Sequence, residues 1–223
     1  MPVQAERYGV SLPSWSTYQP KLPIRCVCKP CNNGWMSRLE NRVRPHLEPL
    51  LTGPRVLDAD AQTTISIWAV KTAMVLEGKD TDLKKGYSQF QRERFRLRAE
   101  IPWRTSVWLA ASADAHSFMS TKNRHMDATS KEISGVSSTM VFGAVALQVL
   151  TMRVPPEIGP NTLITTNVRQ GPWSDATLQI WPAREAATWP PSVGLNGELG
   201  LNLLADRFST TECGRDEIDT LTV

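Results

Sequence analysis

The residues with the clearest chemical potential lie between positions 26 and 35. Three cysteines, Cys26, Cys28 and Cys31, fall within six positions, and Asn32 follows them directly. A Cys-x-x-Cys pair supplies two thiolate ligands of a tetrahedral zinc site, and such a site needs four ligands. The spacing of Cys28 and Cys31 therefore predicts half of a zinc site.

The other ligands would have to come from elsewhere in the chain. Cys26 lies two positions before Cys28, and we do not expect it to join the pair. His46 follows Cys31 by fifteen residues, but Pro45 makes the direction of its side chain hard to predict. Three interpretations stay open: a metal-free pair that starts a helix, a structural zinc held by Cys28, Cys31 and His46, and a redox disulfide.

The stretch RCVCKPCNNGWMSRLE (25–40) resembles the second half of the HNH endonuclease motif, the ββα-metal finger. In that family a late Cys-x-x-Cys is followed directly by Asn or His, where a helix begins. A similar actinobacterial and phage group also carries counterparts of IWAVKTAMVLE (67–77) and of the Trp-Pro motifs at 180–182 and 189–191. The resemblance implies DNA as a partner, a structural zinc, and magnesium or manganese as cofactor if the protein cleaves.

The resemblance also assigns roles to single residues. It implies a catalytic role for Asn32, which takes the motif position after the second cysteine. Lys29, Arg38 and Arg42 flank the helix that docks on DNA in HNH nucleases, so the resemblance implies that they bind nucleic acid. Cleavage further needs an upstream His as general base, and no His or Cys precedes Cys26. We therefore expect either a catalytically degenerate protein or a start downstream of the family's first half.

Three helices are expected before residue 101. The first should begin at Gly34 and end near Arg44, because a proline follows. The second should run from about 61 to 77, capped by an aspartate at 58 or 60. The third, shorter and rich in arginine, should fall between 80 and 98.

After residue 102 the pattern changes to strands. Runs of β-branched and aromatic residues occupy 105–112, 116–123, 139–150 and 176–182. The gaps between them are too short for helical crossovers, which favours an antiparallel sheet. Asn196 to Phe208 should form a helix on that sheet. The expected fold class is α+β, with a partial ββα-metal finger and helices, then an antiparallel sheet with a packed C-terminal helix.

The expected organisation is a partial finger (1–56), a helical segment (57–100) and a β-rich domain (101–223). A second hypothesis follows from it: the protein is a non-catalytic interaction module whose β-rich part binds a protein partner.

The composition limits the functional classes further. Of 223 residues, 41% are hydrophobic and 21% are charged, as in ordinary globular proteins, and a net charge of +3 permits a nucleic-acid partner. No apolar run approaches the roughly 20 residues that span a bilayer. The first six residues lack the features of a signal peptide. We therefore expect a cytoplasmic protein with reduced cysteines and no membrane partner.

Overall fold

The computed structural model describes the backbone of residues 27–79, 86–127, 134–153 and 173–208, together with six two-residue strands elsewhere. Side chains are described for 27–78, 86–112, 135–152, 175–197 and 199–208. The short strands form antiparallel pairs: β1 (Pro2–Val3) with β4 (Trp15–Ser16), β2 (Glu6–Arg7) with β3 (Val10–Ser11), and β8 (Leu163–Ile164) with β11 (Thr220–Leu221).

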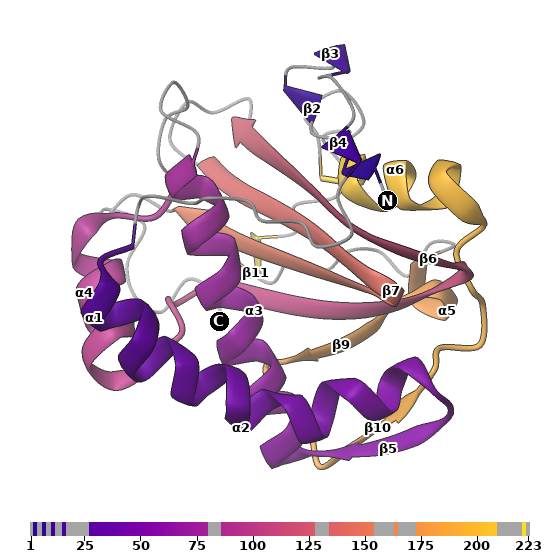
Figure 1. The fold of residues 1–223 in the computed structure, drawn as a ribbon, viewed down its shortest axis with the longest axis horizontal. Helices are drawn as coiled ribbons and strands as arrows, with labels where there is room; N and C mark the ends of the chain where they lie inside the picture. Colours follow the sequence, from indigo (N-terminus) through magenta and orange to yellow (C-terminus); the bar gives the residue numbers. More distant parts are fainter. Residues whose placement is uncertain are drawn as a thin grey trace.

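The first half of the described chain is mainly helical (Figure 1). Its elements in order are α1 (Lys29–Cys31), the π-helical turn η1 (Asn32–Met36), α2 (Ser37–Leu47), the 3-10 turn η2 (Glu48–Leu51), β5 (Arg55–Asp58), α3 (Ala59–Lys79) and α4 (Gln89–Arg98). The helices predicted at 61–77 and between 80 and 98 are confirmed as α3 and α4. Asp58 caps α3 as expected, because its Oδ1 accepts the Ala61 N–H at 2.8 Å.

The predicted limits of the first helix are wrong at both ends. Helical structure starts earlier, at Lys29, and bends at Gly34, whose φ of −96° and ψ of −110° are not helical. At the other end α2 continues through Pro45 to Leu47. Val43 is buried and Leu47 packs against the core. We attribute the continuation to these apolar contacts, which offset the hydrogen bond that Pro45 cannot donate.

A three-stranded antiparallel sheet follows, in the order β7-β6-β9. Its strands are β6 (Thr105–Asp127), β7 (Ser134–Arg153) and β9 (Leu178–Trp181). The antiparallel sheet is confirmed, but the strands predicted at 105–112 and 116–123 are one strand. Two register shifts against β7, on either side of His116, take the place of the expected turn.

The remaining elements extend and cover this sheet. A second antiparallel pair joins β5 to β10 (Ala186–Trp189), and α5 (Trp173–Ala176) precedes β9. The predicted C-terminal helix is confirmed as α6 (Gly197–Asp206), and it packs on β6 and β7. The α+β class is therefore confirmed. The two strands of a ββα finger would lie before residue 27, where the structure describes the two-residue strands β1 to β4 and no other residue.

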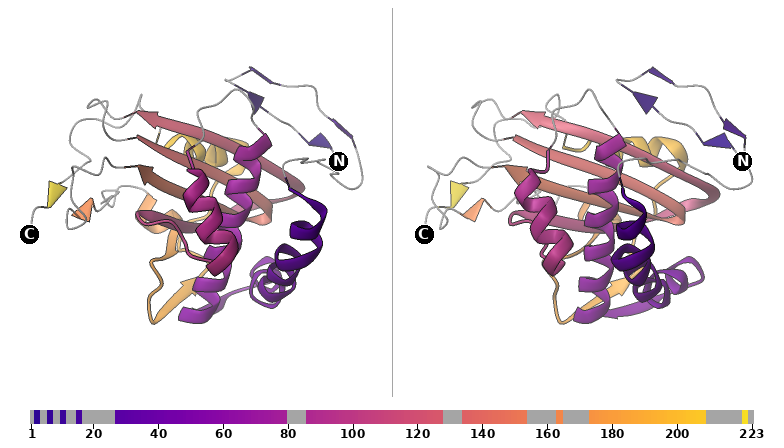
Figure 2. Two further views of the ribbon diagram at one scale, coloured as in Figure 1. Left: turned by 90° about the vertical axis from the view of Figure 1, so that its left-hand side faces the viewer. Right: turned by 60° about the vertical axis from the view of Figure 1, so that its left-hand side comes forward.

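Helices cover both faces of the sheet (Figure 2). Val107 and Leu109 of β6 belong to the apolar cluster that contains residues of α3. Ala110, the next residue along β6, belongs to the cluster that contains Leu204 of α6. Successive strand residues point to opposite faces, so α3 and α6 lie on opposite sides. The Gln148 side chain joins the second face to α6, because its Nε2 donates to the Leu204 carbonyl at 2.7 Å.

One apolar cluster unites the helices with the sheet. It includes Val43 of α2, Ile65 of α3 and Val149 of β7, all buried. Residues from each of the three ranges expected from the sequence therefore pack together. Among the described residues, no helix is both long and apolar enough to cross a bilayer.

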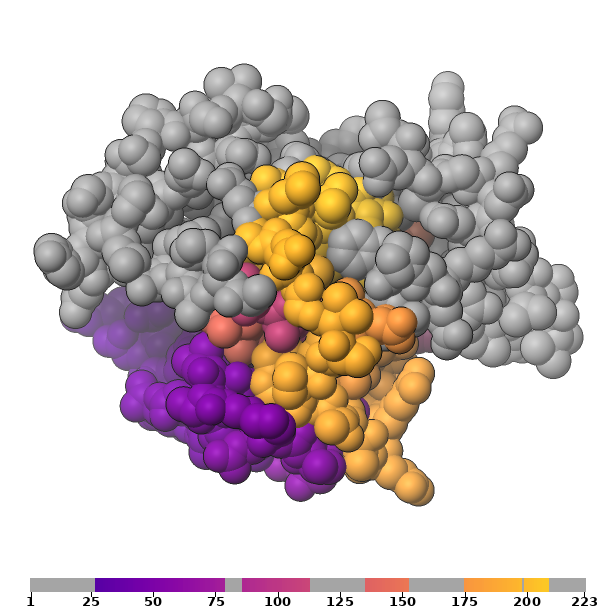
Figure 3. Space-filling view, turned by 90° about the vertical axis from the view of Figure 1, so that its right-hand side faces the viewer, coloured from indigo at the N-terminus to yellow at the C-terminus, as the bar shows by residue number. Residues whose placement is uncertain are grey.

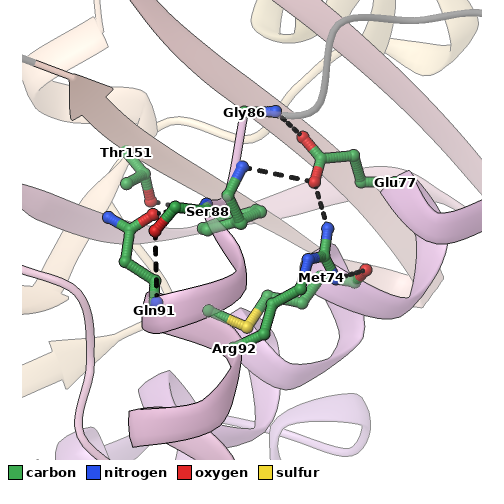
Figure 4. Close-up of polar contacts among 8 residues, drawn as sticks. Met74, Glu77, Gly86, Ser88, Gln91, Arg92 and Thr151 are labelled. Atoms are coloured by element: carbon green, nitrogen blue, oxygen red, sulfur yellow. Dashed lines mark hydrogen bonds and ion pairs between the residues drawn. The ribbon is translucent and has the colours of Figure 1, made fainter.

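A buried carboxylate fixes the start of α4 to the end of α3 (Figure 4). Glu77 of α3 accepts hydrogen bonds from the backbone N–H groups of Gly86 and Tyr87 and from the Arg92 guanidinium. Arg92 also donates to the Met74 carbonyl at 2.7 Å. No side chain fits at Gly86, because an added Cβ would lie 2.5 Å from Val136.

Candidate functional site

The predicted site lies at the start of a bent helix that comprises α1, η1 and α2. We call residues 29–47 the finger helix. Cys28 is its N-cap residue, with extended φ and ψ of −70° and 150°, and its carbonyl accepts the Asn32 N–H at 3.0 Å. Pro30 lies in the first turn, where its missing N–H would have no helical partner. The sequence Cys-Lys-Pro-Cys therefore starts the helix locally.

The two cysteines at this helix start form what we call the thiol pair. Both Cys28 and Cys31 are free thiols; Cys28 is exposed and Cys31 is half-buried. The Cys28 side chain hydrogen-bonds to Cys31, and this is the main cause that lowers the pKa of Cys31 below its ordinary value. Partial loss of water acts in the opposite direction, while Trp35 and Arg96 lower the pKa further.

Helix α4 brings Arg96 to the thiol pair. The ring of Trp35, in η1, meets the ring of buried Phe95 edge-on, with centroids 6.1 Å apart. Arg96 follows Phe95 in α4, and its guanidinium interacts with Cys31 both by hydrogen bonding and by charge. A thiolate at Cys31 would thus have a cation and an indole N–H beside it. Sequence reasoning missed Arg96, because its only signal was an alternating arginine run that also fits a solvated helix face.

His46 does not belong to the thiol pair. It lies in the last turn of α2, at the opposite end of the finger helix from Cys31. In the part of the chain that the structure describes, no three His, Cys, Asp or Glu side chains form a group that could hold a metal ion. The predicted zinc set of Cys28, Cys31 and His46 is therefore not assembled. The described residues offer two of the four ligands that structural zinc takes, so they do not fit this ion.

Asn32, the predicted catalytic residue, is exposed next to the thiol pair. Its Nδ2 donates to the Oδ1 of neighbouring Asn33 at 3.3 Å. His46 is the one histidine with a described side chain; those of His116 and His125 lie outside the described ranges. Among the described side chains, Asn32 is therefore not accompanied by a histidine that could act as general base.

The three predicted nucleic-acid contacts lie along the finger helix, and all are exposed. Arg42 pairs with Asp60 of α3 at 3.5 Å, and both side chains are largely exposed. Such pairs contribute about 1 kcal/mol or less. Lys29 and Arg38 make no ion pair with any described residue. These two cations are available to an anionic partner.

Motif residues outside the cysteine region contact the finger helix or the turn η2 that follows it. Glu40 accepts the indole N–H of Trp68 at 2.6 Å and an ion pair from the ammonium of Lys71. The Trp189 indole N–H donates to the Leu50 carbonyl at 3.0 Å. The segments 25–40 and 67–77 therefore contact each other directly, which sequence spacing alone did not reveal.

Comparison of the chain with protein-family models, with curated proteins and with solved structures gives no match. The HNH-like resemblance therefore stays a prediction from the residues themselves.

Proposed function

We propose that this chain is an HNH-endonuclease-like protein that binds nucleic acid, DNA in the first place, through the finger helix. The observation that carries the proposal is the exposure of Lys29 and Arg38 without an ion-pair partner among the described residues. Phosphate contacts from such cations supply most of the affinity in sequence-independent nucleic-acid binding.

The support beneath these cations favours binding over a passive solvated face. Val43 is buried in the main core, and Glu40 is joined to Trp68 and Lys71 of α3. The finger helix is thus fixed on its inner side while its cations face outward. A fixed helix loses little conformational freedom when it binds, which favours affinity.

Cleavage is not part of the proposal. Hydrolysis of a phosphodiester needs a general base and a divalent ion, and the described residues place neither a histidine nor a complete metal group beside Asn32. We expect no nicking of plasmid DNA with magnesium or manganese. Nicking that disappears in Asn32→Ala would overturn this part.

A cytoplasmic location belongs to the proposal, since reduced thiols such as the thiol pair are typical of that compartment.

Fluorescence anisotropy with a labelled duplex, at a series of salt concentrations, tests the binding. Log affinity should fall linearly with log salt, with a slope of about −0.9 per phosphate contact. Lys29→Ala and Arg38→Ala should each weaken binding several-fold and reduce the slope by about 1. Arg184→Ala is the matched control: it removes one exposed cation from the loop between β9 and β10 and should leave both values unchanged. Equal losses in all three variants would reject the finger helix as the binding surface.

The outer side of α6 favours a second candidate, a protein partner on the β-rich part. Leu199 and Leu203 lie one helical turn apart and are 71% and 47% exposed. Figure 3 shows the yellow atoms of α6 on the outer face of the molecule. Light scattering and cross-linking first test a second copy as the partner. Leu199→Asp with Leu203→Asp should abolish association, whereas Val56→Asp, at an equally exposed position of β5, should not.

A further inference from the structure

We propose that Cys28 and Cys31 close reversibly to an intramolecular disulfide, which makes the start of the finger helix a redox-sensitive site. This inference goes beyond nucleic-acid binding and does not depend on it. It rests on the position of the two cysteines at the N-cap and in the first turn of one helix, on the exposure of Cys28 and on the absence of a side-chain cap that would hold it.

The backbone already places the two side chains near bonding distance. Cys28 is the N-cap and Cys31 the third residue of the helix, and residues three apart on a helix have Cβ atoms about 5–6 Å apart. A disulfide takes Cβ atoms about 3.5–4.5 Å apart. A closing shift of about 1–2 Å is therefore enough, and the two thiols are near enough for Cys28 to lower the pKa of Cys31.

Cys28 is free to make this shift. It is exposed, lies outside the helix proper, and forms no side-chain cap. Its carbonyl accepts the Asn32 N–H at 3.0 Å, a bond that holds the backbone and not the side chain. The described residues also complete no metal site that would occupy both sulfurs.

The reaction is a thiol–disulfide exchange with a small-molecule disulfide as oxidant. The exposed Cys28 sulfur, as thiolate, attacks one sulfur of the reagent, forms a mixed disulfide and releases the first reagent thiol. Cys31 then attacks the Cys28 sulfur, the mixed bond breaks, and the second reagent thiol leaves. The protein loses two hydrogen atoms and the reagent gains them. Arg96 lies beside Cys31, where the attacking sulfur carries negative charge in the second step.

Glutathione disulfide and intact-protein mass spectrometry test the proposal. The full chain carries Cys26→Ser and Cys213→Ser, because those two cysteines lie outside the described residues. EDTA is present so that trace metal does not protect the thiols. We expect the loss of two hydrogen atoms, no lasting glutathione adduct, and full recovery with a reducing agent. Absence of reaction, or a stable glutathione adduct without loss of hydrogen, overturns the proposal.

Single-cysteine variants in the same background test the order of steps. Cys31→Ser should trap the glutathione adduct on Cys28. Cys28→Ser should react at least several-fold more slowly, since the remaining sulfur is half-buried. Arg96→Gln should slow closure of the disulfide several-fold, and Arg94→Gln, two residues earlier on α4, should not.

If the serine background fails to fold by circular dichroism, peptide mapping of the natural chain identifies the Cys28–Cys31 bridge or its absence. No nucleic acid enters the assay, so its failure leaves the proposed binding function untouched.

Discussion

Glu77 joins the end of α3 to the start of α4. Its side chain is 1% exposed and accepts hydrogen bonds from two backbone N–H groups and from Arg92. A buried carboxylate is stable only when such donors replace water. The sequence did not point to it, because a glutamate at the end of a helix is ordinary and its partners lie nine to fifteen residues further on.

We expect Glu77→Ala to lower the free energy of unfolding by about 3 kcal/mol, because it leaves two N–H donors and the Arg92 cation without their acceptor. Urea unfolding followed by circular dichroism measures the loss. Arg94→Ala is the matched control, since its ion pair with Glu100 is exposed on both sides and should cost less than about 1 kcal/mol. Similar costs for both variants would show that the junction tolerates an unpaired Arg92.

Tyr87 should make the fold sensitive to alkali. Burial raises the pKa of its phenol well above the usual value, and Thr151 donates a hydrogen bond to it at 3.2 Å. Because the folded-state pKa is the higher one, the neutral phenol stabilises the fold fully below about pH 10, the ordinary tyrosine value. Stability should then fall as pH rises above about 10, where the unfolded chain ionises first.

Ultraviolet titration of the three tyrosines checks this prediction. The fraction of the signal that belongs to Tyr87, identified by its absence in Tyr87→Phe, should appear only with unfolding. Ionisation of that fraction in a still folded protein, near pH 10, contradicts the buried position.

At the scale of elements, two helix starts that look alike in sequence differ in their caps. Ser88 and Gln91 form a complete capping box at α4, in which each side chain accepts the other residue's backbone N–H. Asn196 occupies the same position at α6 but makes no side-chain cap bond. Ser88→Ala should therefore cost about 1 kcal/mol in urea unfolding, and Asn196→Ala less than half of that. A larger loss in Asn196→Ala would show that its side chain has a role other than capping.

The elements themselves were largely predictable, for physical reasons that also explain the errors. The many apolar residues of α3 and its cap at Asp58 are local signals, so the helix followed from the sequence. Pro45 is also a local signal, but its cost is overridden by apolar contacts of Val43 and Leu47 with distant residues. The single long strand β6 depends on register shifts against β7, and no pattern within 105–127 specifies those.

At the scale of the whole molecule, metal should contribute little to stability. The thiol pair lies at the surface, and the buried clusters contain no described cysteine. Two thiolates bind zinc more weakly than four, so we expect well under one equivalent of zinc by elemental analysis after purification without added metal. EDTA should remove it and leave the melting temperature nearly unchanged. A full equivalent that resists EDTA would mean that further ligands come from residues outside the described ranges.

The candidate site could be predicted only in part, because some of its residues are close in sequence and others come from a separate helix. Cys28, Cys31 and Lys29 are adjacent in sequence, and the turn that unites them is local. Arg96 comes to the thiol pair because Trp35 packs on Phe95, and such a contact between separate helices leaves no trace in spacing. The helix continues through Pro45, so the structure places His46 in the last turn of α2 and does not bring it to the thiol pair; its role as a zinc ligand stays a prediction.

The shared core leads to a last prediction, that helices and sheet unfold together. Val43 of α2 and Val149 of β7 are both buried in the main cluster, although they come from the first and the last of the ranges expected from the sequence. Val43→Ala and Val149→Ala delete the same two methyl groups, and each should cost about 1–3 kcal/mol. Because one cluster links both residues, either variant should shift a single transition, seen alike by tryptophan fluorescence and far-ultraviolet circular dichroism. If Val43→Ala produced a separate early transition while Val149→Ala shifted only a later one, the helical part and the β-rich part would be independent folding units, and nucleic-acid binding could then be pursued on the helical part alone.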